Sequence, residues 1–225
     1  MTIKKTKLFT STKSSLQELK YYIYLPDHYE KIKLPLVLFL HGAGERGGDL
    51  NLIETHGLPK LIKNGENFPF IIIAPQCSSH QWWSDPTPLD LLSSLIDEVA
   101  LLDFVDENQI YCTGLSMGGY GTLALSIKRP KLFSAIIPIC GGVDIQNYFN
   151  LQNLKNTPIW MFHGDQDEII PLKNSEEIYQ GLKSKNKNIK LTVYKNIGHN
   201  AWDKAYNDKR IYLWMLQFKK NNDNQ

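Results

Sequence analysis

The hydrophobic positions of this chain fall into short runs separated by polar or glycine-rich segments. Residues 34–40 (LPLVLFL) and 70–74 (FIIIA) are continuous apolar runs, as expected of strands buried on both faces. Residues 18–25 (ELKYYIYL) are aromatic and partly alternating, which predicts β structure up to about residue 25. Residues 89–105 repeat apolar positions at helical spacing, which predicts an amphipathic helix.

The remaining apolar segments continue this alternation of strands and helices. The pattern predicts strands at 109–113, 133–140, 158–162 and 190–194, helices at 51–63 (interrupted near Gly57 and Pro59), 121–128, 171–183 and 201–218, and a short helix with a linker at 144–154. Strands that alternate with helices indicate an α/β fold, with a mostly parallel sheet covered by helices on both faces. We therefore expect a single domain over residues 1–225, with a possible N-terminal β extension at 1–20 and a polar tail at 219–225.

Composition narrows the class of protein. The 225 residues include 42% hydrophobic and 21% charged side chains, as in a soluble globular domain. A formal net charge of +2 argues against a nucleic-acid partner held by general electrostatics. No apolar run is long enough to cross a membrane, and the first residues lack the apolar core of a signal peptide. Cys77, Cys112 and Cys140 are an odd number without framework spacing, so we expect a reducing, cytoplasmic location.

Residues 114–118 (GLSMG) form a G-x-S-x-G pattern between a predicted strand and a predicted helix. In a nucleophile elbow, glycines on both sides of the serine let the backbone pass close to its neighbours. The sharp corner exposes the serine hydroxyl, here of Ser116, and directs the next backbone N–H, here of Met117, at a developing oxyanion. The alternative is an ordinary strand–helix turn with a capping serine.

Polar side chains that could support Ser116 follow other predicted strands. Because ligands of open α/β sheets bind beyond the carboxyl ends of the strands, these side chains are expected on one rim. Asp167 and His199 occur there in the order Ser, Asp, His, which is the order found in α/β-hydrolases. Histidine suits a general base, and a carboxylate orients the imidazole. Asp165 competes with Asp167 for the acid role, and His163 is expected to pack against neighbouring loops.

Residues 42–47 (GAGERG) fit G-x-G-x-x-G after a strand, which raises the possibility of a dinucleotide site. That site also needs an immediate helix and a carboxylate at the end of the next strand, which here ends in Ala-Pro-Gln. We favour an oxyanion hole, in which the N–H of Ala43, or of Gly44, pairs with that of Met117. The chain has no P-loop lysine and no H-E-x-x-H spacing, so neither a cofactor nor a metal is expected.

Trp82 and Trp83 lie in a polar loop on the same predicted rim. Adjacent residues of an extended segment face opposite ways, so one ring is expected to line an acyl or alcohol pocket while the other packs beneath it. Gly44 is placed in the same substrate pocket. The alternative is that both tryptophans only anchor the loop.

Together these residues resemble the α/β-hydrolase superfamily, and within it the small bacterial carboxylesterases of the phospholipase/carboxylesterase and dienelactone hydrolase-like group, including predicted peptidases. The matching stretches, which span nearly all of residues 21–216, are YYIYLPDHY, LVLFLHGAGERGGD, IIIAPQC with the following WW, IYCTGLSMGGYGTL, IPICGG, MFHGDQDEIIP and GHNAWDKAYND with IYLWML. The resemblance implies Ser116 as nucleophile, Asp167 as acid, His199 as base, and oxyanion N–H groups from Ala43 and Met117. It also implies a short cap or none, rather than a large lid.

The sequence therefore predicts a serine carboxylic ester hydrolase that works through an acyl-enzyme intermediate. An open site with two nearby tryptophans favours small-molecule substrates, namely short-chain or aromatic esters. A thioesterase or small-peptide hydrolase would use the same residues. A non-catalytic binding protein on a hydrolase scaffold would be expected to lack one of Ser116, Asp167 and His199, and none is missing. No nucleic-acid partner and no membrane insertion are expected.

Overall fold

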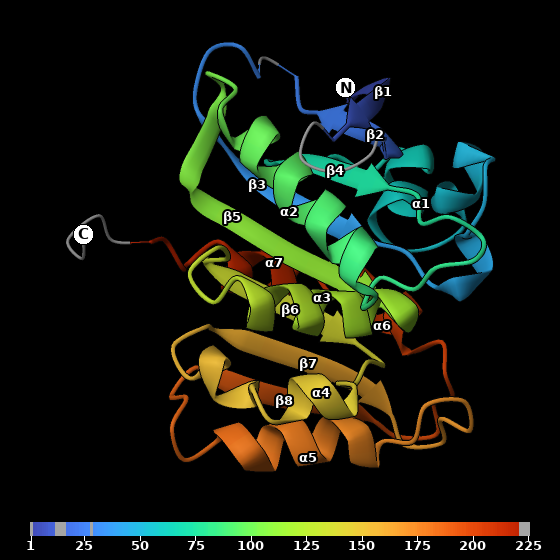
Figure 1. Cartoon of the computed structure of the whole chain (residues 1–225), viewed down its shortest axis with the longest axis vertical. Coiled ribbons are helices and arrows are strands. Elements are labelled where there is room, and N and C mark those ends of the chain that lie inside the picture. The colour runs from blue at the N-terminus through green and yellow to red at the C-terminus, as the bar shows by residue number, and fades with distance from the viewer. Residues whose placement is uncertain (1, 12–16, 28, 221–225) are drawn as a thin grey trace.

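One eight-stranded sheet runs through the molecule in the order β1-β2-β4-β3-β5-β6-β7-β8 (Figure 1). This computed structural model describes residues 2–11, 17–27 and 29–220. The strands are β1 (Ile3–Thr10), β2 (Glu18–Leu25), β3 (Leu34–Leu40), β4 (Ile71–Pro75), β5 (Val105–Leu115), β6 (Ala135–Ile139), β7 (Ile159–Gly164) and β8 (Ile189–Tyr194). The α-helices are α1 (Gly57–Lys63), α2 (Pro86–Ala100), α3 (Met117–Lys128), α4 (Ile145–Tyr148), α5 (Lys173–Leu182), α6 (Ala201–Asn207) and α7 (Arg210–Met215). Short 3-10 helices are η1 (Ala43–Glu45), η2 (Leu50–Thr55) and η3 (Leu151–Leu154).

The direction of the strands places the loops that follow β3, β5 and β6 at one edge of the sheet. The six strands from β4 to β8 in the sheet order pair in parallel, whereas β1 with β2, and β2 with β4, pair antiparallel. The predicted mostly parallel α/β sheet is therefore confirmed. The ends of β3, β5 and β6 lie in register, with Leu40 opposite Gly114 and Leu115 opposite Ile139. The loops that follow these strands therefore meet at one rim.

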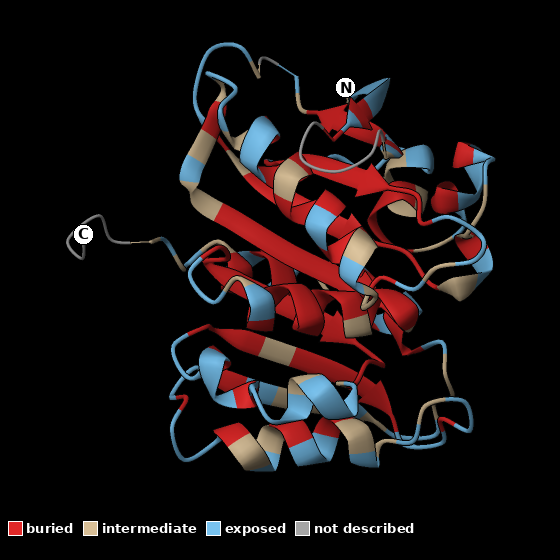
Figure 2. Ribbon diagram, viewed as in Figure 1, coloured by how far each residue is buried: buried red, intermediate tan, exposed pale blue. Residues whose placement is uncertain are grey.

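Helices cover both faces of the sheet (Figures 1 and 2). Alternate residues of β3 pack in two different hydrophobic cores, because successive side chains of a strand point to opposite faces. Leu36 and Leu38 pack in the core shared with α2, α3 and α5. Val37 and Phe39 pack in the core shared with α1, α6 and α7. Burial on both sides explains why β3 is apolar throughout.

Two predicted helices have different bounds in the structure. The helix expected at 89–105 begins at Pro86 and ends at Ala100, because proline is well tolerated in the first turn and residues 101–104 turn into β5. The helix expected at 201–218 is two helices, α6 and α7. Asp208 separates them: its backbone is extended and its carboxylate accepts the N–H of Arg210 at 3.0 Å. A local side-chain acceptor of this kind interrupts the helix and starts the next one.

The helix predicted after the G-x-S-x-G segment also has a different start in the structure. Helix α3 begins at Met117, four residues before the predicted start at Gly121. Its second and third residues are glycines, which are poor helix formers. A Cβ on Gly118 would collide with the Leu40 carbonyl, and one on Gly119 would lie 2.7 Å from the Ile139 carbonyl. Tertiary packing therefore outweighs intrinsic propensity here. The interruption expected near Gly57 is confirmed, since His56 lies between η2 and α1 and Gly57, the first residue of α1, has a φ of 63°. Pro59 does not interrupt the helix, because it lies in the first turn of α1, where proline is tolerated.

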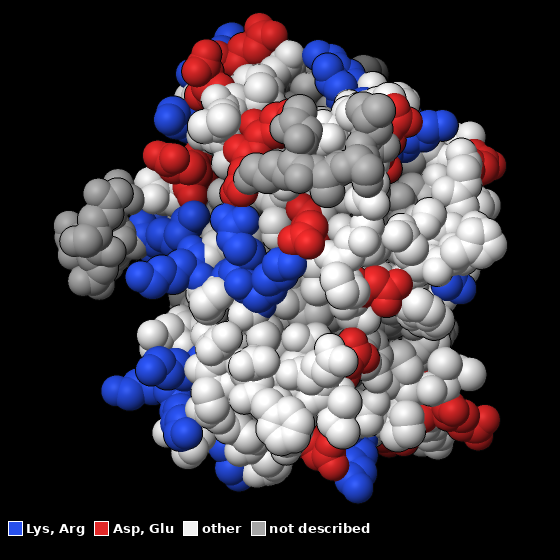
Figure 3. Space-filling view, in the orientation of Figure 1, with Lys and Arg blue, Asp and Glu red and all other residues white. Residues whose placement is uncertain are grey.

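Charges of both signs share the face drawn in Figure 3, where lysine and arginine form a band at mid-height and acidic side chains lie above it. Charged side chains pair between α2 and the end of α3: Lys128 approaches Asp90 at 2.6 Å and Arg129 approaches Asp97 at 3.0 Å. Such exposed pairs contribute little stability each, about 0–1 kcal/mol. Among the described residues, no helix is both long and apolar enough to cross a membrane.

Candidate active site

Ser116 sits at the corner between β5 and α3 in a strained backbone conformation. Its φ is 54° and its ψ is −116°, values that few non-glycine residues adopt. The strain is held in place because Gly114 and Gly118 both pack without a Cβ against the Leu40 carbonyl. The Ser116 side chain makes no capping hydrogen bond to α3, which removes the alternative of a capping serine. Its hydroxyl instead contacts the imidazole of His199.

A continuous hydrogen-bonded chain joins Ser116, His199 and Asp167. The Ser116 Oγ lies 2.9 Å from His199 Nε2, and His199 Nδ1 lies 2.8 Å from Asp167 Oδ2. Because the carboxylate can only accept, Nδ1 carries the proton and Nε2 accepts from the serine hydroxyl. The Asp167 side chain is fully buried and that of His199 is 20% exposed. We call these residues the Ser–His–Asp chain.

The Asp167 carboxylate is surrounded by hydrogen-bond donors. Its Oδ1 accepts the backbone N–H groups of Ile169 at 3.0 Å and Ile170 at 2.8 Å. Its Oδ2 faces His199 and also His163 Nε2, at 3.2 Å. Donors on both oxygens satisfy a buried carboxylate that would otherwise be costly. They also fix the direction in which the carboxylate faces His199.

His163 is held by a network of its own. It is fully buried at the end of β7. Its Nε2 lies 2.8 Å from the carbonyl of Ile170, and its Nδ1 lies 2.8 Å from Ser175 Oγ. Since a carbonyl only accepts, Nε2 is the protonated nitrogen, and it can donate to Asp167 as well. The expected packing role is thus supplemented by a contact with the Ser–His–Asp chain that the sequence reasoning missed.

Asp165, the competing acid, has a different position. Its Oδ1 accepts the N–H of Asn196 at 2.7 Å, in the turn after β8. Close to it, a Cβ on Gly164 would collide with the carbonyls of Ile197 and Gly198. Asp165 therefore fixes the backbone that presents His199, rather than touching the imidazole.

Cys140 contributes a further contact to the same loop. It follows β6 with a φ of 44°, and its Sγ lies 3.0 Å from the carbonyl oxygen of His199. Burial raises the pKa of the Cys140 thiol well above its usual range, and the nearby Asp167 charge adds to the effect. The thiol therefore stays protonated and can donate to that carbonyl.

The turn after β3, residues 41–46, lies directly beside Ser116. A Cβ on Gly42 would come within 2.9 Å of Leu115 Cδ1, one residue before the serine. Ala43 opens η1 and Met117 opens α3, so the N–H group of each lies in a first turn, where helices leave donors unsatisfied. The buried Glu45 carboxylate accepts the Gly42 N–H at 2.7 Å and closes the turn. The G-x-G-x-x-G residues thus form a tight 3-10 turn rather than the start of a long helix.

The two tryptophans of the loop have different surroundings. Trp83 is fully buried, and its Nε1–H donates to the carbonyl of His41 at 3.1 Å. Its ring packs edge-on against the His41 imidazole, with centroids 5.1 Å apart. Trp82 is 49% exposed and Gly44 is exposed. Of the three residues expected in a pocket, Trp83 therefore packs beneath the surface, and Trp82 and Gly44 remain accessible.

Comparison with known proteins assigns this arrangement to a family. The family model described as Phospholipase/Carboxylesterase matches residues 86–214, more than half of the chain. The chain belongs to the phospholipase/carboxylesterase family. It is thus an α/β-hydrolase of the esterase and carboxylesterase class, and the predicted family resemblance is confirmed.

Individual relatives agree with that assignment. Carboxylesterase SOBER1 of Arabidopsis thaliana is 25% identical over 203 residues, which cover 80% of this chain and 88% of that protein. The crystal structure of a thermostable esterase is 31% identical, with a TM-score of 0.80, over 96% of this chain. The chain spans 63% of that esterase, less than two thirds of its length. The S-formylglutathione hydrolase of Staphylococcus aureus (TM-score 0.76, 16% identity) shares the fold.

In this member of the carboxylesterase family, three residues of metal-ligating type meet where Ser116, His199 and Asp167 are hydrogen-bonded. Donor atoms of Cys140, Asp167 and His199 all lie within 4.8 Å of one another. Each is already engaged inside the protein, the thiol with a carbonyl, the carboxylate with four donors, and the imidazole with Asp167 and Ser116. The cluster is therefore explained by the hydrogen-bonded chain itself.

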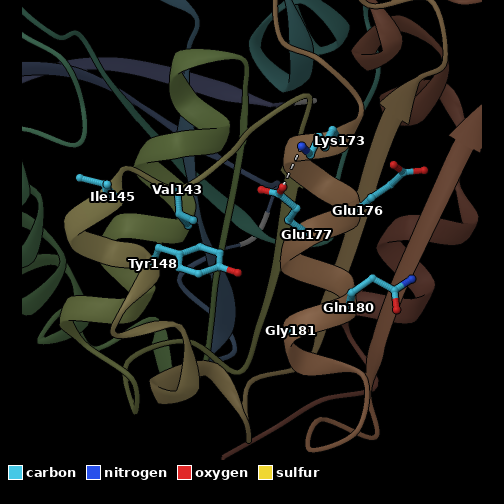
Figure 4. Close-up of a pocket in the computed structure, with 8 residues that line it drawn as sticks. All are labelled: Val143, Ile145, Tyr148, Lys173, Glu176, Glu177, Gln180 and Gly181. Atoms are coloured by element: carbon cyan, nitrogen blue, oxygen red, sulfur yellow. Dashed lines mark ion pairs between the residues drawn. The ribbon is translucent and has the colours of Figure 1, made fainter.

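A groove of about 900 Å³ lies between α4 and α5 (Figure 4). Its lining residues are Val143, Ile145, Tyr148, Lys173, Glu176, Glu177, Gln180 and Gly181. Figure 4 shows the Tyr148 ring pointing towards α5, where Lys173 pairs with Glu177 at 3.6 Å. No member of the Ser–His–Asp chain lines this groove, so it is not the place where Ser116 would meet a substrate.

Proposed function

We propose that this chain is a serine carboxylic ester hydrolase with Ser116 as nucleophile, His199 as base and Asp167 as acid. The observation that carries the proposal is the continuous Ser–His–Asp chain, with contacts of 2.9 and 2.8 Å, at a strained strand–helix corner. A serine hydroxyl is a weak nucleophile at neutral pH and needs an adjacent base. Here the base is in contact, and its tautomer is set by a buried carboxylate.

In the first half of the reaction, Ser116 Oγ attacks the ester carbonyl while its proton moves to His199 Nε2. The imidazolium that forms is stabilised by Asp167, whose side chain is fully buried. The carbonyl oxygen becomes an oxyanion, which the backbone N–H groups of Ala43 and Met117 receive. His199 then gives its proton to the leaving alcohol, and the acyl group remains on Ser116.

In the second half, water replaces the alcohol. His199 takes a proton from the water, the resulting hydroxide attacks the acyl carbonyl, and the same two N–H groups hold the second oxyanion. Collapse of this intermediate returns the proton to Ser116 Oγ and releases the carboxylic acid. Apart from the ester substrate and water, every group used in these steps belongs to the protein.

We place the substrate preference at short-chain or aromatic esters. The described residues include no large lid above Ser116, and Trp82, which is 49% exposed, offers an aromatic surface on the loop after β4. A p-nitrophenyl ester series from acetate to palmitate tests the preference. Activity should peak at short acyl chains, and a maximum at long chains would reject it.

The test of the reaction itself is Ser116→Ala. This variant should lose at least about 10³-fold in kcat, because nucleophile and base act as a unit. A fluorophosphonate probe should label the native protein and not the variant. Ser184→Ala, which changes an exposed serine of the loop after α5, is the matched control and should keep full activity. Unchanged hydrolysis by Ser116→Ala would reject the proposal.

The same residues could cleave a thioester or a small peptide. Amides differ because the leaving nitrogen must be protonated as it departs, whereas thiolates leave readily. Assays with matched ester, thioester and dipeptide substrates, each with Ser116→Ala as the blank, distinguish the three. We expect the ester to give the highest kcat/KM. A protein that only binds these compounds would turn over none of them.

A further inference from the structure

Arg46 occupies an unusual place beside the proposed oxyanion hole. Its Nε donates to the carbonyl of Ala43 at 3.0 Å, and its Nη1 donates to the carbonyl of Gln81 at 3.4 Å. The guanidinium is therefore tied both to the 41–46 turn and to the loop after β4. Since Gly42 packs against Leu115, this turn adjoins Ser116. Arg46 is thus positioned on the same rim as the reacting groups.

The positive charge of Arg46 has no carboxylate partner in the described part of the chain. Within the described residues, no Asp or Glu forms an ion pair with it. The neighbouring acids are engaged elsewhere: Glu45 accepts the Gly42 N–H, and Asp85 accepts the Trp82 N–H at 2.7 Å. Partial burial removes some of the hydration of the guanidinium, which an anion could replace.

The remaining donors of Arg46 form a fork. Guanidinium has five N–H groups, and the two backbone contacts use the Nε–H and one Nη1–H. One Nη1–H and both hydrogens of Nη2 have no hydrogen-bond partner in the part of the chain that the structure describes. Paired donors of this geometry match the two oxygens of a carboxylate.

Trp82 holds this fork in a defined orientation. The Arg46 guanidinium carbon lies 4.7 Å from the centroid of the Trp82 ring. The contact is a cation–π interaction, which immobilises the arginine before any ligand arrives. Trp82 is itself 49% exposed, so the pair presents an aromatic surface and a cation together at the rim. A prepositioned fork loses less side-chain entropy when an anion binds.

We propose that Arg46 and Trp82 form a subsite for a carboxylate carried by the ester substrate. The inference rests on the proposed function and narrows its substrate class to small esters with an anionic group near the scissile bond. The carboxylate accepts from the free N–H groups of Arg46, while the uncharged part of the substrate lies against Trp82. The ester carbonyl meanwhile reaches Ser116.

The test compares anionic esters with uncharged isosteres. Monoethyl succinate, glutarate and adipate place the carboxylate at increasing distances on the acyl side, and an isopropyl group replaces it in each isostere. Acetoxyacetate against isobutyl acetate tests the alcohol side. For the best-fitting pair, we expect the native protein to show a kcat/KM at least about tenfold higher for the anionic ester, by pH-stat titration. A ratio near one for every pair would overturn the proposal.

Variants separate recognition from structural support. Arg46→Gln should remove most of the preference, and Arg46→Lys should keep part of it, because lysine retains the charge but not the fork. If Arg46→Gln lowered both members of each pair by the same factor, Arg46 would only support the turn, and the subsite would be rejected. Arg129→Gln removes a partly buried arginine that pairs with Asp97 and should leave the ratio unchanged. Loss of the ratio in this control would mean a general field effect and would also reject the subsite.

A binding measurement keeps this test independent of turnover. In Ser116→Ala protein, the dicarboxylate that matches the best spacing should raise the melting temperature, and the added change Arg46→Gln should abolish that rise. No rise in either protein would reject the subsite. If esters were not hydrolysed in a Ser116-dependent way but this shift was present, the proposed reaction would fail and the carboxylate site would stand.

Discussion

Among the residues that the structure describes, three non-glycine residues have a positive φ, and all lie at the rim: Ser116 (54°), Cys140 (44°) and Asn196 (57°). Each follows a strand of the parallel sheet, and each is held by contacts with another segment. Ser116 N–H donates to the Ile139 carbonyl, and Cys140 N–H donates to the Phe162 carbonyl. Such conformations cost about 1–3 kcal/mol each and persist only where neighbouring structure imposes them. Individual residues are thus strained at the place where loops from different strands meet.

His163 is expected to affect turnover more than substrate binding. His163→Leu removes the Nε2–H that faces Asp167, so the carboxylate is held less firmly against His199. We expect kcat to fall about tenfold or more with KM nearly unchanged, as when an orienting hydrogen bond is lost. His163→Gln places an amide N–H near the same position and should restore part of kcat. Equal losses in both variants, or a loss confined to KM, would contradict the role.

His41 is expected to make the protein sensitive to acid. Burial lowers the pKa of His41 from 6.5 to about 4, and Arg46 adds to the effect against the opposing hydrogen bond to the Gly42 carbonyl. The folded state therefore binds the proton less tightly than the unfolded state. The contribution of neutral His41 to the free energy of unfolding is therefore complete above pH 6.5. It falls by about 3 kcal/mol as the pH drops from 6.5 to 4.

Urea unfolding between pH 7.5 and 4 measures this dependence. His41→Asn should be less stable than the native protein at neutral pH, because the imidazole accepts the Cys77 N–H at 3.0 Å. The difference in unfolding free energy between the two proteins should shrink as the pH falls from 6.5 to 4. A difference that stays constant over this range would show that His41 does not titrate as its burial implies.

At the scale of elements, the site depends on how closely α3 packs on the sheet. Its first turn lies against the carbonyl ends of β3 and β6, through Gly118 and Gly119. This contact aims the N-terminus of the helix, with the Met117 N–H and the positive end of the helix dipole, at the space above Ser116. The turns after β7 and β8 then bring Asp167 and His199 to the same place.

Gly118→Ala is expected to disturb both stability and activity. The added Cβ would collide with the backbone carbonyl of Leu40, which cannot move away as a flexible side chain could. Overpacking of this kind costs about 1–3 kcal/mol and should shift Ser116 relative to His199, so that kcat falls. Gly48→Ala is the matched control, because no atom lies within 4 Å of its added Cβ. Equal melting temperatures and kcat for the two variants would contradict the packing argument.

At the scale of the whole molecule, one sheet carries two cores, and helices on both faces complete them (Figure 2). We infer that the chain folds as a single domain for that reason. Within the N-terminal extension expected at 1–20, β1 pairs with β2 along its whole length, and residues 1 and 12–16 lie outside the described part. The expected tail begins with Lys219, whose Nζ reaches Asp106 at 2.7 Å, and residues 221–225 lie outside the described part.

The cysteines provide a test of this folded state. Cys77, Cys112 and Cys140 are free and at most 1% exposed, and burial raises the pKa of the Cys77 thiol to about 12. Since the thiolate is the reactive form, none should react with DTNB in the folded protein. All three should react in denaturant. Rapid labelling of the native protein would contradict the burial.

The sequence alone determined the fold class, most of the strands, and the order in which the candidate Ser, Asp and His residues occur. Apolar runs such as that of β3 are readable because burial on both faces excludes polar residues. The meeting of Ser116, Asp167 and His199 at one rim was predictable because each follows a strand at the carboxyl edge. Helix bounds were less predictable where proline, glycine or Asp208 sits at an end. At these positions capping and packing decide the boundary, rather than propensity.

Only the tertiary structure decided which atoms meet. It placed Asp167 rather than Asp165 against His199, since a spacing of two residues in a loop leaves either carboxylate free to reach back. It also separated buried Trp83 from exposed Trp82. It brought His163 and Arg46 to the site through contacts between strand-end loops that are distant in sequence. Such contacts depend on the three-dimensional register of several strands, which no local pattern encodes.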